Sequence, residues 1–173
     1  MKKFEIVIVV MAIFLIIHSE MMAQVSSTAA SVGIDAKVIA PISIENTGST
    51  VLNFGTVTRS SLPGTVVVTA DGDRSATGGA SILGSSAFSA APFSASGENN
   101  ADFNIALPDD NDVVMTRDGG TETMEVTGFG HNSSLVLSAS GISTFSVGAT
   151  LNLDANQVAG DYSGSFSVTI NYQ

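Results

Sequence analysis

The sequence predicts an all-β protein, an antiparallel immunoglobulin-like β-sandwich of about nine or ten short strands. Short stretches in which apolar and polar residues alternate recur at spacings of about 8–12 residues, with turn residues between them. The apolar period of an amphipathic helix is hard to find anywhere in the chain. Ser, Thr, Gly and Ala are abundant, which suits short strands joined by many turns.

Residues 1–23 are typical of a secretory signal peptide. Two lysines precede an uncharged apolar run, Ile6–Ile17, which is short for a membrane span of about 20 residues. Ala23 is a small residue suited to the position before the cut, and an uncleaved N-terminal anchor is the alternative. We therefore expect an exported protein of the periplasm, the cell surface or the extracellular space. Its mature chain divides into a flexible leader, residues 24–31, and one sandwich domain, residues 32–173.

Charge and cysteine content limit the classes of partner. Without residues 1–23 the chain keeps four of its six basic residues and fourteen of its sixteen acidic residues. That balance excludes a basic nucleic-acid footprint and argues against binding to anionic lipid headgroups. The absence of cysteine removes disulfides, thiol catalysis and cysteine-based zinc sites. We expect no cofactor and no membrane span in the mature protein.

The first expected strand of the domain follows the leader. Apolar Val32, Ile34, Ala36 and Val38 alternate there with small or charged residues, which is the pattern of a half-buried strand. Pro41 then interrupts backbone pairing, because proline donates no hydrogen bond.

Further strands are expected between turns along the rest of the chain. Residues 65–70 are a β-branched run typical of a central strand. Residues 113–116 and 121–127 flank a four-residue connection, as in a β-hairpin. Residues 145–153 alternate strictly. Shorter strands are expected around Leu52 and Phe54, over residues 88–95 and 103–107, and around Leu135 and Leu137.

The last strand has the clearest pattern in the chain. Gly160 and Asp161 supply a turn, and polar uncharged residues alternate with an inward-facing set up to the penultimate position. That inward-facing set is Tyr162, Gly164, Phe166, Val168, Ile170 and Tyr172.

Features at the two ends of the domain point to a known class of protein. Tyr172 is the penultimate residue, and Gly160 is fourteenth from the end within the stretch G-D-Y-S-G. Residues 36–44 read A-K-V-I-A-P-I-S-I. These features resemble the fimbrial (pilin) subunits of the chaperone–usher type, in particular their cysteine-free class, with residues 36–44 similar to the donor segment and following proline.

A second resemblance covers nearly the full mature chain. The matching stretches are A-P-I-S-I at 40–44, L-N-F-G at 52–55, V-G-A-T-L at 147–151 and the G-D-Y-S-G ending. In order and spacing they resemble a family of secreted bacterial domains known as domain of unknown function 4402. This resemblance implies a fold but little about function.

The pilin resemblance implies an incomplete sandwich that lacks its last strand. A periplasmic chaperone, and then the N-terminal strand of the next subunit, fills the groove beside the C-terminal strand, and an usher assists assembly. Adding a strand satisfies the exposed backbone while alternate side chains fill pockets. The alternative is that the same residues pack inside one complete domain. The donor side chains would be Val32, Ile34, Ala36 and Val38, and the acceptor or core residues Gly160, Tyr162, Phe166, Val168, Ile170 and Tyr172.

Catalytic and metal-binding patterns are weak. His131 is the one histidine of the mature chain, and because no G-x-S-x-G motif accompanies it, we expect an exposed loop residue. Asp109, Asp110 and Asp112 are a calcium candidate, although the glycine and distal glutamate of an EF-hand loop are missing. We do not expect an enzyme.

Together these observations predict a secreted structural or adhesive protein of a bacterial surface, similar to a pilus subunit. Its expected partners are further copies of itself or neighbouring pilin-like subunits, with a periplasmic chaperone and an usher. The alternative is a stand-alone, monomeric secreted or surface domain that binds a carbohydrate or a protein.

Overall fold

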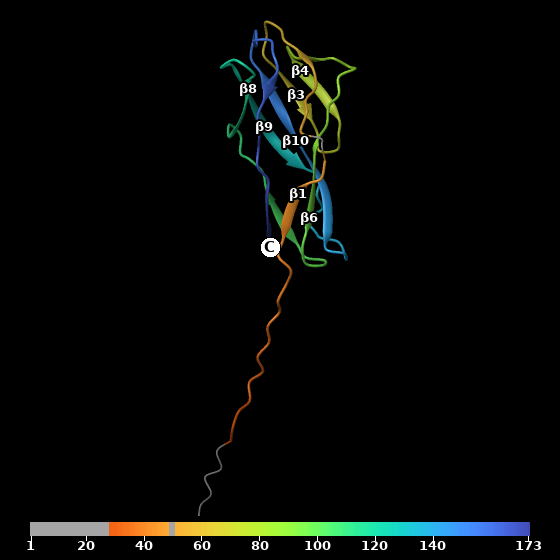
Figure 1. The fold of residues 1–173 in the computed structure, drawn as a ribbon, viewed down its shortest axis with the longest axis vertical. Coiled ribbons are helices and arrows are strands. Elements are labelled where there is room, and N and C mark those ends of the chain that lie inside the picture. The colour runs from red at the N-terminus through yellow and green to blue at the C-terminus, as the bar shows by residue number, and fades with distance from the viewer. Residues whose placement is uncertain (1–27, 49–50) are drawn as a thin grey trace, which may run out of the picture. The chain divides into compact units, whose positions relative to one another are not determined.

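The computed structural model describes residues 28–48 and 51–173. The predicted signal peptide and the first residues of the predicted leader lie outside this range. The chain divides into two units, Met1–Lys37 and Val38–Gln173, and all the strands belong to the second unit. As predicted, this part of the chain is all-β: the described residues form twelve strands in antiparallel sheets and no helix (Figure 1).

The twelve strands are short except for two. The strands are β1 (Ser43–Asn46), β2 (Val57–Thr58), β3 (Gly64–Val68), β4 (Arg74–Gly78), β5 (Ser81–Ile82), β6 (Ala91–Ser96), β7 (Phe103–Ala106), β8 (Val113–Arg117), β9 (Thr123–His131), β10 (Ile142–Leu153), β11 (Tyr162–Ser163) and β12 (Thr169–Tyr172).

The long strand β10 is the centre of the largest sheet. The strand order is β1-β6-β10-β9-β8-β11. Strand β3 also pairs with β10, and β4 pairs with β3. Residues 142–147 of β10 pair with β6, whereas residues 149–153 pair with β3. The pairs β12–β7 and β2–β5 form two small separate sheets. The first part of β10 therefore belongs to one half of the domain, with β6, and its last part belongs to the other half, with β3.

Gly148 occupies the point at which β10 changes partner. A Cβ atom there would collide with the carbonyl oxygen of Val68 and lie 2.5 Å from the carbonyl carbon of Thr69. On the other side of β10 the register with β9 shifts, and Gly128 of β9 takes a positive φ of 60°. A glycine and a bulge together allow one strand to belong to both halves.

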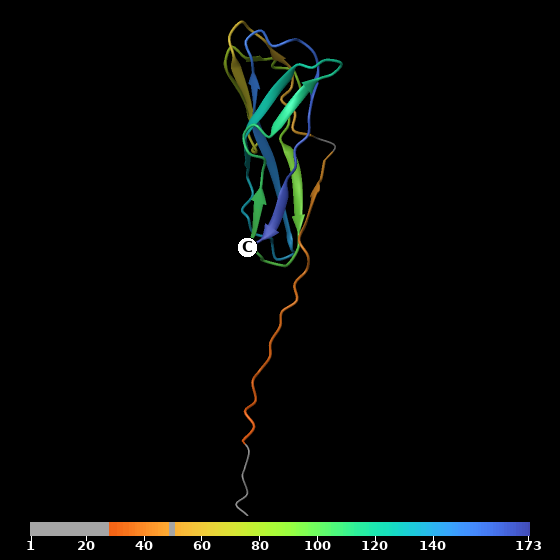
Figure 2. The same cartoon turned by 90° about the vertical axis from the view of Figure 1, so that its left-hand side faces the viewer.

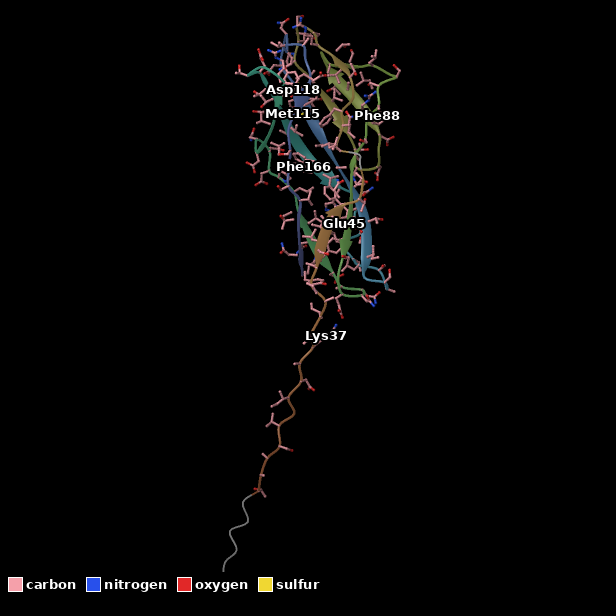
Figure 3. The ribbon with its side chains drawn as sticks, viewed as in Figure 1. Lys37, Glu45, Phe88, Met115, Asp118 and Phe166 are labelled. Atoms are coloured by element: carbon pink, nitrogen blue, oxygen red, sulfur yellow. The ribbon has the colours of Figure 1, made fainter. Side chains whose placement is uncertain are left out.

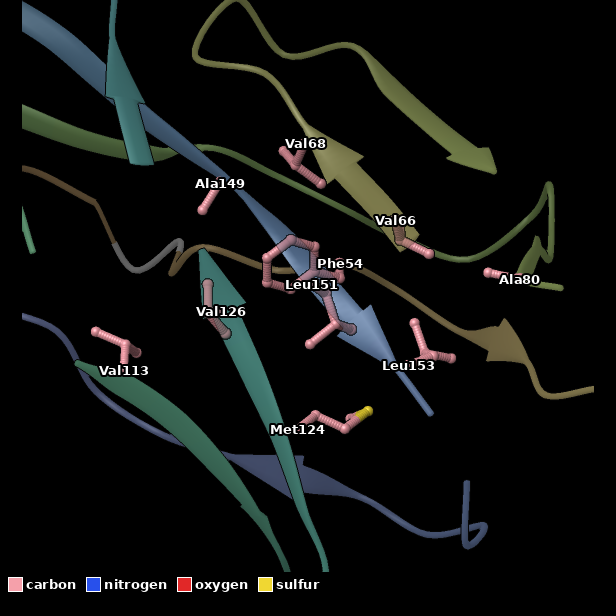
Figure 4. Close-up of a cluster of buried hydrophobic side chains, with 10 residues drawn as sticks. All are labelled: Phe54, Val66, Val68, Ala80, Val113, Met124, Val126, Ala149, Leu151 and Leu153. Carbon is pink, nitrogen blue, oxygen red and sulfur yellow. The ribbon is translucent and has the colours of Figure 1, made fainter. Parts of the chain in front are cut away.

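Two hydrophobic clusters fill these halves. The terminal cluster lies beside the C-terminal strand, where β7 and β12 run side by side (Figure 2) and pack against β6 and β10. The hairpin-side cluster lies under the β8–β9 hairpin (Figure 4). The terminal cluster is Ala95, Phe103, Leu137, Phe145, Val147 and Ile170. The hairpin-side cluster is Phe54, Val66, Val68, Ala80, Val113, Met124, Val126, Ala149, Leu151 and Leu153.

This arrangement is compatible with the predicted sandwich and matches several of the expected strands. Residues 65–70 correspond to β3, which pairs on both edges as a central strand should. The expected hairpin corresponds to β8 and β9, in which Thr116 pairs with Thr123. The strictly alternating residues 145–153 lie within β10, which begins three residues earlier.

Four expectations about strands are wrong. No strand forms over residues 32–38, and the first described strand begins at Ser43. An extended segment becomes a strand only when it pairs, and residues 32–38 pair with none of the described strands. The last strand is interrupted between β11 and β12, which pair with different strands, β8 and β7. Residues around Leu135 and Leu137 contribute only an isolated bridge, from Val136 to Asp102. Residues around Leu52 and Phe54 likewise contribute only an isolated bridge, from Asn53 to Ser89.

Candidate functional site: an apolar groove beside the C-terminal segment

A groove of about 1210 Å³ opens over the hairpin-side cluster. Residues 51–57 line one margin and residues 157–166 line the other. Met115 of β8 and Phe166 of the C-terminal segment both face this space (Figure 3). The apolar lining residues between the margins come from β6, β8, β9 and β10 and are Ala91, Phe93, Val113, Met115, Met124, Val126, Phe129, Leu151 and Leu153.

The groove lies over the hydrophobic core of this half of the domain. Six of the ten residues of the hairpin-side cluster line it, and each of the six is at most 8% exposed, so the two margins already cover most of the cluster. Where the two halves meet, the ring of Phe166 lies 5.1 Å from the ring of Phe129 and 6.4 Å from that of Phe93, centroid to centroid. These aromatic rings close the groove towards the terminal cluster.

The C-terminal margin of the groove has a row of backbone without strand pairing. Strand β11 pairs with β8 and strand β12 pairs with β7, but residues 164–168 between them belong to no strand. An extended segment of this kind beside an apolar groove is a template for a further strand.

Two glycines hold the C-terminal margin close to the β8–β9 hairpin. A Cβ atom on Gly160 would lie 2.8 Å from Cδ of Arg117, and one on Gly164 would lie 2.9 Å from the carbonyl oxygen of Val114. The backbone of Asp118 donates to the carbonyl oxygen of Asp161 at 2.8 Å. The G-D-Y-S-G stretch is therefore glycine-flanked because its backbone approaches the hairpin directly.

An ion pair stabilises the hairpin on which this margin rests. Nε of Arg117 donates to Oε2 of Glu122 at 2.7 Å, and the two side chains are 27% and 34% exposed. This hydrogen bond lowers the pKa of Glu122 below its ordinary value and raises the pKa of Arg117. Both groups thus stay charged at neutral pH.

Arg74 organises the opposite margin. Its guanidinium donates to the carbonyl oxygens of Phe54 at 3.0 Å and Leu83 at 3.1 Å, and to the hydroxyl of Ser86 at 3.0 Å. It also lies 4.4 Å from the centroid of the Phe88 ring. Arg74 therefore ties the margin containing Phe54 to the loop after β5. Sequence reasoning missed this role, and the only available signal was that few basic residues exist.

The predicted acceptor or core residues divide between the groove and the core. Gly160, Tyr162 and Phe166 line the groove. Ile170 belongs to the terminal cluster, and Val168 and Tyr172 pack against it. Sequence reasoning also missed the opposite margin and the lining between the two, because neither lies near the C-terminal strand in sequence.

The predicted donor residues are exposed. Val32 is 85% exposed, and Ile34 and Val38 are each 94% exposed, while Ala36 is also exposed. Large apolar side chains are seldom this exposed in a run of alternating positions, and such a run indicates an interaction site.

The other candidate residues have structural contacts. His131 ends β9 and is half-buried, so the expectation of an exposed loop residue is wrong: Nδ1 accepts a hydrogen bond from the Ser133 backbone, and the ring meets Phe145 edge-on. Asp110 accepts a hydrogen bond from the Gly128 backbone at 2.7 Å. Among the described residues no group of three metal-ligating side chains occurs, and calcium binding by Asp109, Asp110 and Asp112 stays a prediction.

The fold and the groove define a class of protein: an all-β antiparallel domain with an apolar groove over its hydrophobic core, beside its C-terminal segment. The chain belongs to the family described as Domain of unknown function (DUF4402), whose model matches residues 42–172. No curated protein and no solved structure matches the chain. Within the described residues, no helix has the length and apolar character needed to cross a membrane.

Proposed function

We propose that this protein is an exported structural or adhesive subunit of a bacterial surface, which accepts an extended strand from another copy of itself into the apolar groove. The observation that supports the proposal most strongly is the apolar groove over the hairpin-side cluster, which lies between two margins and beside residues 164–168, a segment outside any strand. A strand laid there would cover the apolar lining and pair with backbone that has no strand partner.

The occupant that we propose is the N-terminal segment of a second molecule, with Val32, Ile34, Ala36 and Val38 directed into the groove. These residues alternate over seven positions, and the margin of residues 51–57 is also seven positions long. At about 3.3 Å per residue an extended donor segment of this length spans roughly 23 Å. Donation from each molecule to the next does not close on itself and produces a filament.

Assembly on an unheated denaturing gel tests this function. The protein, exported with its own signal segment, is expected to run as a ladder of strand-exchanged polymers that collapses on heating. Ile34→Asp places a charge in the groove and is expected to abolish the ladder. Ser31→Asp is the matched control, because it adds the same charge at a position that alternates with the donor residues, and its ladder is expected to persist.

A monomeric protein with no ladder before or after either substitution contradicts the proposal. That result favours the stand-alone domain that binds a carbohydrate or a protein. A chaperone and an usher would assist assembly in the cell, and their genes beside this one would agree with the proposal.

A further inference from the structure

Both backbone groups of Ala40 are held at the end of the domain that contains the terminal cluster. The hydroxyl of Tyr172 donates to the carbonyl oxygen of Ala40 at 2.9 Å and accepts from the Glu98 backbone N–H at 2.6 Å. The backbone N–H of Ala40 donates to Oε2 of Glu98 at 3.2 Å. A Cβ atom on Gly97 would occupy the place of the Tyr172 hydroxyl, so glycine leaves room for it. We call these contacts the Ala40 clamp.

We infer that Tyr172 and Glu98 are positioning residues, which fix Ala40 so that the N-terminal segment of a molecule fills the groove of another molecule and not its own. The inference rests on the proposed function. It adds the contacts that determine whether the N-terminal segment fills the groove of its own molecule or that of a second molecule.

The register of the chain around Ala40 is the first argument. Suppose that the chain reversed direction at Ala40, so that its N-terminal segment ran back beside β1 of the same molecule. Each residue before Ala40 would then lie beside the residue that follows Ala40 at the same separation in sequence. Val38 would then lie beside Ile42, and Val32 beside Gly48. The lining of the groove on this side runs from Asn46 onwards to Arg59.

In its own molecule the apolar segment would therefore pass only Asn46, a polar lining residue, and would stop short of residues 51–57. Residues 24–31, Q-V-S-S-T-A-A-S, would lie opposite the apolar lining instead, and five of these eight residues are polar. Polar side chains in an apolar groove lose hydrogen bonds to water. A segment from a second molecule has no such restriction, because Val32 to Val38 can slide to any level of the groove.

The clamp is the second argument, since the register restriction lasts only while Ala40 is fixed. Strand β1 has four residues and pairs along one edge only, with β6. Its Ile44, together with Ile42, packs against the terminal cluster. If β1 detached, residues 41–46 would become slack, and Val32 could advance along the groove of its own molecule. The hydrogen bonds to Ala40 oppose that detachment.

Two eight-residue Gly/Ser insertions test the register. An insertion between Val38 and Ile39 keeps the clamp and lets Val32–Val38 reach the level of the groove in their own molecule. The control is the same insertion between Ser31 and Val32, which lengthens the chain without moving the donor residues relative to Ala40. The exported proteins are unfolded in guanidinium, refolded, and examined by size-exclusion chromatography with light scattering.

We expect polymers from the wild type and the control, and a compact monomer that resists unheated denaturant from the first insertion. Removal of residues 24–38 distinguishes failure of this inference from failure of the proposed function. A monomeric wild type whose melting temperature falls on this removal already fills its own groove, which overturns the inference and leaves strand acceptance standing. A wild type whose assembly and melting temperature do not change on this removal overturns the proposed function itself.

Substitutions in the clamp test the positioning residues. Tyr172→Phe and Glu98→Ala are each expected to raise the ratio of compact monomer to polymer about fivefold or more, since each removes at least one hydrogen bond. Glu98→Gln keeps an acceptor for the Ala40 N–H and is expected to behave as the wild type. The compact monomer is distinguished from unfolded chain by its resistance to unheated denaturant. An unchanged ratio in both Tyr172→Phe and Glu98→Ala overturns the role of the clamp.

Discussion

Glycines at close backbone contacts are the residues on which this fold depends most. Gly148 and Gly130 face each other across β10 and β9, yet their surroundings differ completely. The place of a Cβ atom on Gly148 is taken by the backbone of Val68 and Thr69, whereas nothing lies within 4 Å of a Cβ atom on Gly130. One pair of residues in register thus offers a test and its control.

Gly148→Ala is expected to lower the free energy of unfolding by about 1–3 kcal/mol, the usual cost of forcing extra atoms into a packed core. Gly130→Ala is expected to change it by less than about 0.5 kcal/mol, as exposed substitutions usually do. Denaturant unfolding of the two variants beside the wild type measures the difference. Equal stability of the two variants would show that β3 can move away from β10 without cost.

At the scale of the element, the two margins of the groove are held by different means. The C-terminal margin rests on the β8–β9 hairpin through Gly160 and Gly164 and through the Asp118 backbone. The opposite margin is held by the guanidinium of Arg74, by the hydroxyls of Ser86 and Ser89, and by the mutual backbone hydrogen bonds of Asn53 and Ser89. Arg74 is the charged member of this set, and its guanidinium contacts both the margin and the loop after β5.

Arg74→Met removes the three hydrogen bonds of the guanidinium while keeping an apolar stem against Phe88. Hydrogen bonds from a charged group contribute about 1.5–3 kcal/mol, so faster amide exchange at Asn53 and Ser89 is expected, with a fall in stability of that order. The control is Arg59→Met, which removes one exposed hydrogen bond to the Gln157 carbonyl. Unchanged exchange at Asn53 in Arg74→Met would mean that the backbone and serine hydrogen bonds hold the margin without Arg74.

At the scale of the whole molecule, the charge of the chain opposes the assembly that the groove favours. Without residues 1–23 the chain has four basic and fourteen acidic residues, a formal charge of −10, which is also the formal charge of the whole chain. Two such molecules repel each other on approach, and salt screens exposed charges over a Debye length of about 10 Å at 0.1 M.

Raising the ionic strength is therefore expected to speed polymer formation. Refolding followed by light scattering at 0.05 M and 0.5 M sodium chloride measures the rate at equal protein concentration. The control is the variant Ile34→Asp, which is expected to stay monomeric at both concentrations. A slower rate at high salt would point to attraction between opposite charges as the force that brings the molecules together.

The sequence alone determined the fold class and the strands with a pattern of their own. Strict alternation in residues 145–153 and the β-branched run in residues 65–70 both became strands, because side-chain periodicity is a local property that burial of one face requires. The G-D-Y-S-G ending was also visible in the sequence, although its physical reason, contact with Arg117 and Val114, was not.

Only the tertiary structure decided which pieces of chain lie together. The margin of residues 51–57, Arg74, and the pairing of Ala40 with Tyr172 and Glu98 all depend on residues far apart in sequence, where no periodicity relates one to the other. Residues 32–38 also show that a local sequence pattern does not identify the partner of a segment. Their alternation predicted a strand, but an extended segment becomes a strand only beside a partner, and no strand forms there within the chain.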